Sequence, residues 1–578
     1  MKKKLLAAFL CVFVAALHAQ NLEKIGQKDM VTVSGGLNFS SILYDAQGFE
    51  ARRDPFTWFF SGNLNVTILD VSLPFTYSYS NQRGTFTQPF NMQAVHPKWK
   101  WVQAHAGTTA MNFSSYTLSG HVFTGGGVEL TPSGWYAGAM YGRLRKAIAF
   151  DPAMTSAEQM SFRRMGWGVK AGFDKDGHAL GITYFTAKDE PQSVVFLPPG
   201  STLAPMQNTA VSISGKTKLS NWLTASAEYA VSGLTRNINA ESETTDFTGW
   251  QKWLLPTRTT TQFFRAWNAA LTFTQKWYSV ALKHEHVDPD YQTLGAYFFN
   301  NDLENYTVAP SFKLLKGKLN IGINTGFQRN NLDKTRQSTT QRWVGSVNVS
   351  AMPGKNWTIN ASYSNFTAFT NQRPQTDPFW VPTAADTLNF YQLSQQASAM
   401  LSKSFGEKKK WKKNVAVNSM YQVTGQQQSG TVLPSTTIMN GNVSFGLQHA
   451  PSKTTVSVVA NVNQSTTPFS IVTPLGEVSG KIVSQQYGPG LNVSRSFMSG
   501  TMRVAAGSSY NRAVTAGVLT GNVMSTRAQF SWLPKTGNPK WGKPSLQISS
   551  VYIQRLPAAA SSLKTSELTT TVNLNYSF

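Results

Sequence analysis

Residues 284–304 gather acidic and imidazole side chains within an otherwise basic chain, whose formal net charge is +24. Four of these side chains recur at every second position: His284, His286, Asp288 and Asp290. A strand would place them on one face, where imidazole nitrogens and carboxylate oxygens can bind a divalent cation. Pro289 interrupts that strand, however, and no spacing here is diagnostic. The pattern favours a polar rim or lumen patch, with a divalent-cation site as the weaker alternative, and it predicts no cofactor.

The histidines give little indication of a catalytic site. A hydrolase that acts on lipids or peptides needs a nucleophile or an activated water beside a histidine with an orienting partner. No histidine lies in a serine or cysteine motif of that kind, and His284-Glu285-His286 lacks the HExxH spacing of zinc proteases. The sequence therefore predicts that the protein is not an enzyme.

The first nineteen residues are typical of a secretory signal peptide. Lys2, Lys3 and Lys4 precede a short apolar stretch, and Ala19 supplies a small residue for cleavage before Gln20. The single cysteine, Cys11, lies inside this stretch, so the mature chain has no thiol for disulfides or metal binding. We expect a signal peptide at 1–19, a short periplasmic segment at 20–30, and one barrel domain at 31–578.

The composition argues against both a soluble globule and a helical membrane protein. Only 14% of residues are charged and 12% are aromatic, whereas about a quarter of residues are charged in a typical soluble protein. Beyond the signal no apolar run approaches the roughly 18 residues of a membrane helix. Basic residues do not cluster into a nucleic-acid-binding module, so no nucleic-acid partner is expected.

Period-2 alternation is the strongest signal and runs from about residue 31 to the end. In residues 319–328 and 357–364, apolar side chains alternate with Asn, Gly, Ser, Thr and Gln rather than with charged residues. Such strands fit a wall with lipid on one side and an aqueous lumen on the other. In lipid an open sheet edge would leave unpaired backbone groups, so the sheet must close.

Turn signals set the strand count. Tight connections are predicted near these positions: Asp70, Pro97, Ser133, Asp176, Ser220, Lys276, Gly317, Gly354, Lys410, Ser452, Ser499 and Pro539. Two strands and one longer connection lie between successive turns, which gives 26 strands, or 24 if the doubtful turn at Pro97 is omitted. We therefore predict an all-β, antiparallel transmembrane barrel with short periplasmic turns, long extracellular loops and no N-terminal plug domain.

The last eight residues alternate strictly and end on an aromatic residue at the carboxyl terminus. This ending resembles the signal by which outer-membrane proteins are recognised for barrel insertion, which implies the barrel-assembly machinery as a partner. Its outward positions would be Val572, Leu574, Tyr576 and Phe578. Together with the Ala19–Gln20 junction and the Asn-rich strands, the mature chain resembles the large outer-membrane β-barrel proteins of Bacteroidetes-type bacteria.

Opposed charges are predicted inside the lumen. An arginine facing the lipid midplane costs about 2–4 kcal/mol, so arginines should point inward or lie near a rim. The candidates are Arg143, Arg145, Arg163 and Arg164 on the basic side and Glu285, Asp302 and Glu304 on the acidic side. Arg143 and Arg145 lie two apart, which predicts one face. Charges set across a lumen favour charged or polar solutes.

Three long connections are rich in proline and aromatic residues, at 189–207, 237–263 and 371–388. They are expected either to fold into the lumen as a constriction or to present a surface to another protein. Lysines and aromatic residues recur at the tight turns and are expected to form a collar that contacts membrane lipids. For the lysine run Lys408–Lys413, a less favoured alternative is a docking site for an acidic periplasmic partner.

The function predicted from these features is a porin-like channel for polar solutes, which is filled by its own loops or by a second protein. The alternative is a barrel that anchors or translocates a surface-exposed or secreted protein.

Overall fold

The computed structural model describes residues 31–81, 93–150, 160–243, 249–297, 301–335, 341–365, 391–406, 410–428, 431–473, 476–534, 542–558 and 563–578. The predicted signal peptide and the segment 20–30 lie outside these residues. Within the described ranges, no helix is both long and apolar enough to cross a lipid bilayer.

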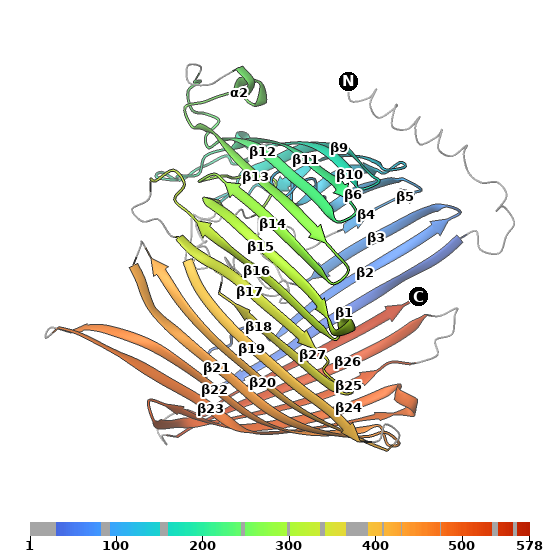
Figure 1. The fold of residues 1–578 in the computed structure, drawn as a ribbon, viewed down its shortest axis with the longest axis vertical. Helices are drawn as coiled ribbons and strands as arrows, with labels where there is room; N and C mark the ends of the chain where they lie inside the picture. Colours follow the sequence, from blue (N-terminus) through green and yellow to red (C-terminus); the bar gives the residue numbers. More distant parts are fainter. Residues whose placement is uncertain are drawn as a thin grey trace.

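Most of the described chain is antiparallel β-structure (Figure 1). The strands are β1 (Val31–Gln47), β2 (Phe56–Ile68), β3 (Val71–Ser80), β4 (Gln93–Val95), β5 (Lys98–Trp99), β6 (Val102–Ala110), β7 (Val122–Leu130), β8 (Trp135–Arg145), β9 (Arg163–Lys175), β10 (His178–Glu190), β11 (Gln207–Ser220), β12 (Leu223–Thr235), β13 (Thr261–Thr274), β14 (Tyr278–Val287), β15 (Leu303–Leu314), β16 (Leu319–Arg329), β17 (Gln341–Ala351), β18 (Trp357–Ser364), β19 (Tyr391–Gly406), β20 (Trp411–Gln428), β21 (Thr431–His449), β22 (Thr454–Thr473), β23 (Gly476–Phe497), β24 (Met502–Thr515), β25 (Val518–Trp532), β26 (Lys543–Pro557) and β27 (Thr565–Ser577). The described helical elements are α2 (Gly249–Leu254) and the 3-10 turns η3 (Pro191–Ser193), η4 (Leu315–Gly317) and η6 (Met498–Gly500).

The sheet closes on itself. Each strand pairs with its sequence neighbour, and β1 pairs with β27 from Gly36–Ser577 to Gln47–Ser566. At the carboxyl terminus, Gly35 N–H donates to the Phe578 carbonyl at 2.8 Å, and Phe578 N–H donates back to Gly35 at 3.0 Å. A closed ring leaves no unpaired edge, which is the condition for crossing lipid with strands.

The described strands form a ring of 26, the higher of the two counts that the sequence left open. Although 27 strands are named, β4 and β5 both pair with β3 on one side and β6 on the other, so together they fill one position. Pro97 lies between these two fragments rather than at the turn, which falls at Lys100, where φ is 51°. Because proline lacks the N–H that a ladder requires, it interrupts the strand instead of turning it.

The two faces of the wall differ in chemistry, because alternate residues of a strand point to opposite sides and paired residues share a side. One face carries exposed aromatic and aliphatic side chains such as Trp167, Tyr229 and Leu271, and this is the outer, lipid-type face. The other face carries polar or small side chains and is the inner face. Adjacent strands about 4.8 Å apart and tilted about 40° give a 26-strand ring a diameter of about 50 Å.

The two ends of the barrel also differ, and we name them the turn end and the loop end. At the turn end the connections are short, for example Asp176-Gly177, where φ values of 54° and 86° suit a tight hairpin. The loop end carries long connections between β1 and β19, as expected. Between β20 and β25, however, it also has short connections, including the two residues Ala516-Gly517, and β20 to β23 are 18 to 22 residues long. Pro539, predicted at a turn, lies outside the described residues.

Candidate functional site

Two connections at the loop end, 111–121 and 288–297, fold back against the inner wall, and we call them the inner loops. They meet the inner sides of β7, β8, β10, β12, β13 and β14 in one apolar cluster. Its members are Met111, Tyr116, Leu118, Phe123, Met140, Leu144, Phe185, Ala187, Ala230, Leu234, Phe264, Ala266, Val287, Tyr291 and Leu294. We call the wall from β6 to β14 the packed arc, because these loops fill the lumen beside it.

The loop 111–121 is fixed to three successive strands. The Tyr116 hydroxyl donates to Glu285 Oε1 on β14 at 3.1 Å and accepts from Asn268 Nδ2 on β13 at 3.1 Å. The Ser114 hydroxyl donates to Glu228 on β12. Glu228, Asn268 and Glu285 are register partners on the inner face, so the loop lies inside the barrel. Burial raises the pKa of Tyr116, which therefore stays a neutral donor.

Asn208 on β11 holds the second inner loop. Its amide nitrogen donates to the Ser232 hydroxyl at 2.7 Å and to the Gly233 carbonyl at 2.8 Å, and its amide oxygen accepts from Leu294 N–H at 3.0 Å. The side chain is fully buried. One side chain thus joins two strands to the loop, and burial makes each of these bonds costly to lose.

The two inner loops also bind each other. Tyr291 donates to the Tyr116 carbonyl at 2.7 Å, and Thr293 donates to the Thr117 carbonyl at 2.8 Å. His121 stacks on Tyr297 with ring centroids 4.2 Å apart. Burial, together with the nearby charges of arginines on β8 and β9, lowers the pKa of His121 to about 4. The imidazole is therefore neutral at physiological pH.

A buried ion cluster closes the loop end of the packed arc. Asp189 is fully buried and accepts from Arg164 Nε at 2.7 Å and Nη2 at 3.0 Å, while Arg145 Nη2 lies 3.3 Å away. The Met206 N–H also donates to this carboxylate at 3.0 Å. Asp189 was not among the residues singled out from the sequence, although its partners Arg145 and Arg164 were.

The two other candidate arginines lie on the outer face. A bulge between Arg143 and Arg145 shifts the register, so that Arg143 pairs with Met165 and Arg145 with Arg164. The expectation that Arg143 and Arg145 share a face is therefore wrong, because the extra residue reverses the alternation. Arg163 forms an ion pair with its cross-strand partner Glu190, also on the outer face near the loop end.

The acidic candidates are likewise divided. Glu285 faces the lumen and binds Tyr116. Glu304 lies on the outer face, where it pairs with Arg329 and accepts from the Tyr306 hydroxyl at 3.0 Å. Asp302 is buried in the connection before β15 and accepts from Leu332 N–H at 2.9 Å. The acidic side chains of the adjacent strands β14 and β15 therefore lie on opposite sides of the wall.

The four candidate metal ligands do not converge. His284 Nε2 lies 3.2 Å from Glu304, and His286 Nε2 lies 3.0 Å from Asp288. Asp290 instead faces Arg236 at 3.5 Å. Among the described residues, no group of three or more His, Cys, Asp or Glu side chains is placed to hold a metal ion.

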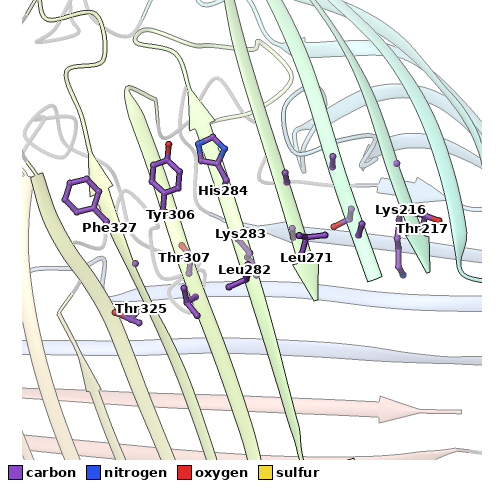
Figure 2. Close-up of a pocket in the computed structure, with 18 of the residues that line it drawn as sticks. Lys216, Thr217, Leu271, Leu282, Lys283, His284, Tyr306, Thr307, Thr325 and Phe327 are labelled. Atoms are coloured by element: carbon purple, nitrogen blue, oxygen red, sulfur yellow. The ribbon is translucent and has the colours of Figure 1, made fainter. Parts of the chain in front are cut away.

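His284 belongs to an outer-wall groove of about 880 Å³ (Figure 2). His284, Tyr306 and Phe327 come from adjacent strands and lie side by side at its edge, above Leu271 and Leu282. Its floor is formed largely by alanine and glycine on β11 to β13. This groove faces the lipid side.

The inner face from β16 to β23, the bare arc, differs from the packed arc. Its register partners include Asn320, Asn360, Asn418 and Asn442, and a groove of about 550 Å³ lies along them. Asn418 Nδ2 donates to Asn442 Oδ1 at 2.9 Å. The sequence alternation predicted these polar inner positions, whereas it gave no indication of which loops fold inward.

The proline-rich and aromatic connections were expected either to constrict the lumen or to present a surface to another protein, and two of them expose large apolar side chains. Val195 is 99% exposed and Phe196 is 57% exposed, in the connection between β10 and β11. Trp253 on α2 is 79% exposed, and Figure 1 shows α2 on a lobe beyond the ends of β12 and β13. The third connection, 371–388, lies outside the described residues.

The carboxyl-terminal strand β27 places Leu574 and Tyr576 opposite Phe39 and Leu37 of β1. Leu574 is exposed on the outer face, and Tyr576 contacts the Phe578 ring with centroids 5.6 Å apart. Val572 follows the same alternation. The four residues predicted as an insertion signal therefore lie at the seam that closes the barrel.

No protein-family model matches this chain, and no curated protein matches it. Solved structures with a similar fold include the P pilus usher (PapC) translocation pore, at 9% identity over 94% of this chain and 99% of that chain, with a TM-score of 0.39. The FrpB iron transporter from Neisseria meningitidis matches at 10% identity over 96% of this chain and 82% of that chain, with a TM-score of 0.34. Acinetobacter baumannii OccAB3 matches at 10% identity over 69% of this chain and 98% of that chain, with a TM-score of 0.30. These values assign no function to this chain, and the closed ring rests on its own strand pairing.

Proposed function

We propose that this protein is an outer-membrane channel for polar solutes whose lumen is partly filled by its inner loops. The observation that carries the proposal is the contrast across the inner wall: the packed arc is sealed by buried contacts, whereas the bare arc presents amide and hydroxyl side chains. A ring about 50 Å across would be a very large hole if empty, so partial filling suits a selective pore.

Reconstitution of the purified barrel alone in a planar bilayer tests this function. We expect steady conductance steps without any partner, because the bare arc is not covered by the inner loops. A barrel that inserts but remains silent at all voltages would contradict the proposal. Membrane fractionation checks the location, since an outer-membrane barrel stays in the detergent-insoluble pellet until harsher extraction.

The second candidate function is an anchor or translocation partner for a surface-exposed or secreted protein. The exposed apolar side chains Val195, Phe196 and Trp253 at the loop end favour it, because large apolar groups in water mark contact surfaces. Crosslinking in native membranes from a cysteine placed at position 195 would test it. A single protein captured at stoichiometric yield would support the anchor, and no capture would leave the channel as the sole function.

A further inference from the structure

The bare arc carries a row of amide side chains across its strands, which one methionine interrupts. Strand pairing aligns Asn360, Asn418, Asn442 and Asn461, with Met400 between the first two. Because paired residues share a face, all of these side chains point into the lumen. Two residues farther along each strand, Asn348, Asn440 and Asn463 belong to a second row, in which Ser362, Ser398 and Met420 separate the first two asparagines. We call these two rows the asparagine track.

The asparagine track is polar without being charged. Among the described residues that line its groove there is neither a charged nor an aromatic side chain. Each amide offers two donors and an acceptor, and neighbouring groups already bind one another, as Ser362 and Ser398 do at 2.6 Å. A surface of this kind gives no electrostatic advantage to ions. It matches ligands whose groups both donate and accept, and hydroxyl groups do so.

The distance between amides on adjacent strands favours ligands whose hydroxyl groups repeat at a similar interval. Adjacent strands lie about 4.8 Å apart, so amides in a row recur at about that interval. This interval is close to the length of one pyranose ring in a linear glycan. A sugar chain lying across β20, β21 and β22 would therefore meet one amide per ring, at Asn418, Asn442 and Asn461. Asn440 and Asn463 of the second row would contact the other edge of two of these rings.

We propose that the asparagine track binds an uncharged linear oligosaccharide that lies across the strands of the bare arc. This proposal rests on the proposed channel function, for which it names the class of solute. An extended neutral polypeptide would also meet the amides, but its backbone groups recur at about 3.3 Å per residue and fall out of step with the strands.

Titration calorimetry of the detergent-purified barrel tests the proposal without requiring conductance. The probes are cellohexaose, maltohexaose, a hexamer of galacturonic acid, and a neutral Gly-Ser hexapeptide. We expect at least one neutral hexasaccharide to bind and the acidic hexamer and the peptide to bind at least about tenfold more weakly, which corresponds to one lost hydrogen bond or more.

Two variants localise the binding. Asn418→Leu with Asn442→Leu removes two amides at nearly constant size, and Asn418→Asp keeps the shape but adds a charge. Both should weaken hexasaccharide binding about tenfold or more. The matched control is Asn38→Leu, an inner-face asparagine of β1 whose amide bonds to Asn575 at 2.5 Å, and it should leave binding unchanged.

Unchanged binding in both track variants, or preferred binding of the peptide or the acidic hexamer, would overturn the proposal. If the barrel is silent in bilayers but still binds a neutral hexasaccharide through the track, the channel function fails while the binding site stands. If it conducts but binds none of the probes, the channel stands and the glycan assignment fails.

Discussion

The packed arc and the bare arc are built from the same alternating strands, yet only one of them has a buried core. In the packed arc, the inner loops 111–121 and 288–297 fold back onto the wall and bury Tyr116, Leu118 and Tyr291. In the bare arc, only two residues separate β20 from β21 and β22 from β23, so these connections are too short to fold back onto the wall. Connection length, rather than strand pattern, therefore explains why the wall from β20 to β23 carries no inner loop of its own.

Glycines on the inner wall of the packed arc leave space for the inner loops. A Cβ added to Gly127 would lie 2.4 Å from Met111 Sδ, and one added to Gly168 would lie 3.0 Å from the Phe113 ring. Both neighbours belong to an inner loop. Asparagine and serine take the corresponding inner positions of the bare arc, for example Asn418 and Asn440. Small inner residues therefore make room for the inner loops in the packed arc, whereas polar residues take these positions in the bare arc.

The largest expected effect is on conductance, when an inner loop is deleted from the packed arc. Replacement of residues 112–120 by Gly-Ser-Gly deletes one inner loop and exposes the inner face of the packed arc. We expect single-channel conductance to rise several-fold, because the packed arc then resembles the bare arc. Replacement of the exposed residues 195–199 by the same linker is the control and should leave conductance unchanged. Equal conductance of both variants would mean that the inner loops do not restrict the lumen.

Ion pairs inside and outside the packed arc offer a comparison in stability. Asp189→Asn leaves Arg145 and Arg164 without their buried carboxylate, so the free energy of unfolding should fall by about 3–5 kcal/mol. Glu567→Gln breaks a pair with Arg555 at 2.9 Å outside the packed arc, where the guanidinium is 40% exposed, and should cost about 1 kcal/mol or less. Urea unfolding in lipid vesicles measures both, and equal losses would contradict the comparison.

Asparagine occurs on the inner face of both arcs, so the same substitution can compare how tightly each arc is packed. Asn208→Ala removes buried bonds to Ser232, Gly233 and Leu294, and we expect a loss of about 2–4 kcal/mol that appears as protease cleavage within 288–297. Asn442→Ala makes the same change on the bare arc. Since its partner Asn418 faces the lumen and water replaces the lost bond, stability should fall by less than about 1 kcal/mol. Similar losses at both positions would show that the bare arc is also packed.

The sequence pattern was sufficient to predict the strands of the barrel wall. Every second residue must match lipid, so alternation in segments such as 319–328 predicted the strands. Turn residues such as Asp176-Gly177 predicted their ends and a count of 24 or 26, and the strand pairing decides for 26. The bulge at Arg143 could not be foreseen, because an inserted residue leaves no compositional trace. It moved Arg143 to the outer face and left Arg145 inside.

The filling of the lumen could not be predicted in the same way. Inner loops have no period, and their contacts join residues far apart in sequence, as between Tyr116 and Glu285. The aromatic, proline-rich connections were candidates for filling the lumen or for contacting another protein, and their side chains Phe196 and Trp253 are exposed to solvent. The wall itself carries a usable signal: glycines at the inner positions Gly127 and Gly168 mark where an inner loop approaches.

The smallest expected effect is a pH response confined to the packed arc. His121 has a pKa of about 4 in the folded loop and about 6.5 when the loop is released, so the released form binds the extra proton between these values. Attachment of the inner loop is therefore fully stable above pH 6.5 and weakens as the pH falls toward 4, where the buried imidazolium would face Arg145 and Arg164. We expect conductance to rise modestly below pH 6. His121→Asn, which cannot be protonated, should keep a constant conductance over this range, and a persistent acid response would place the sensor elsewhere.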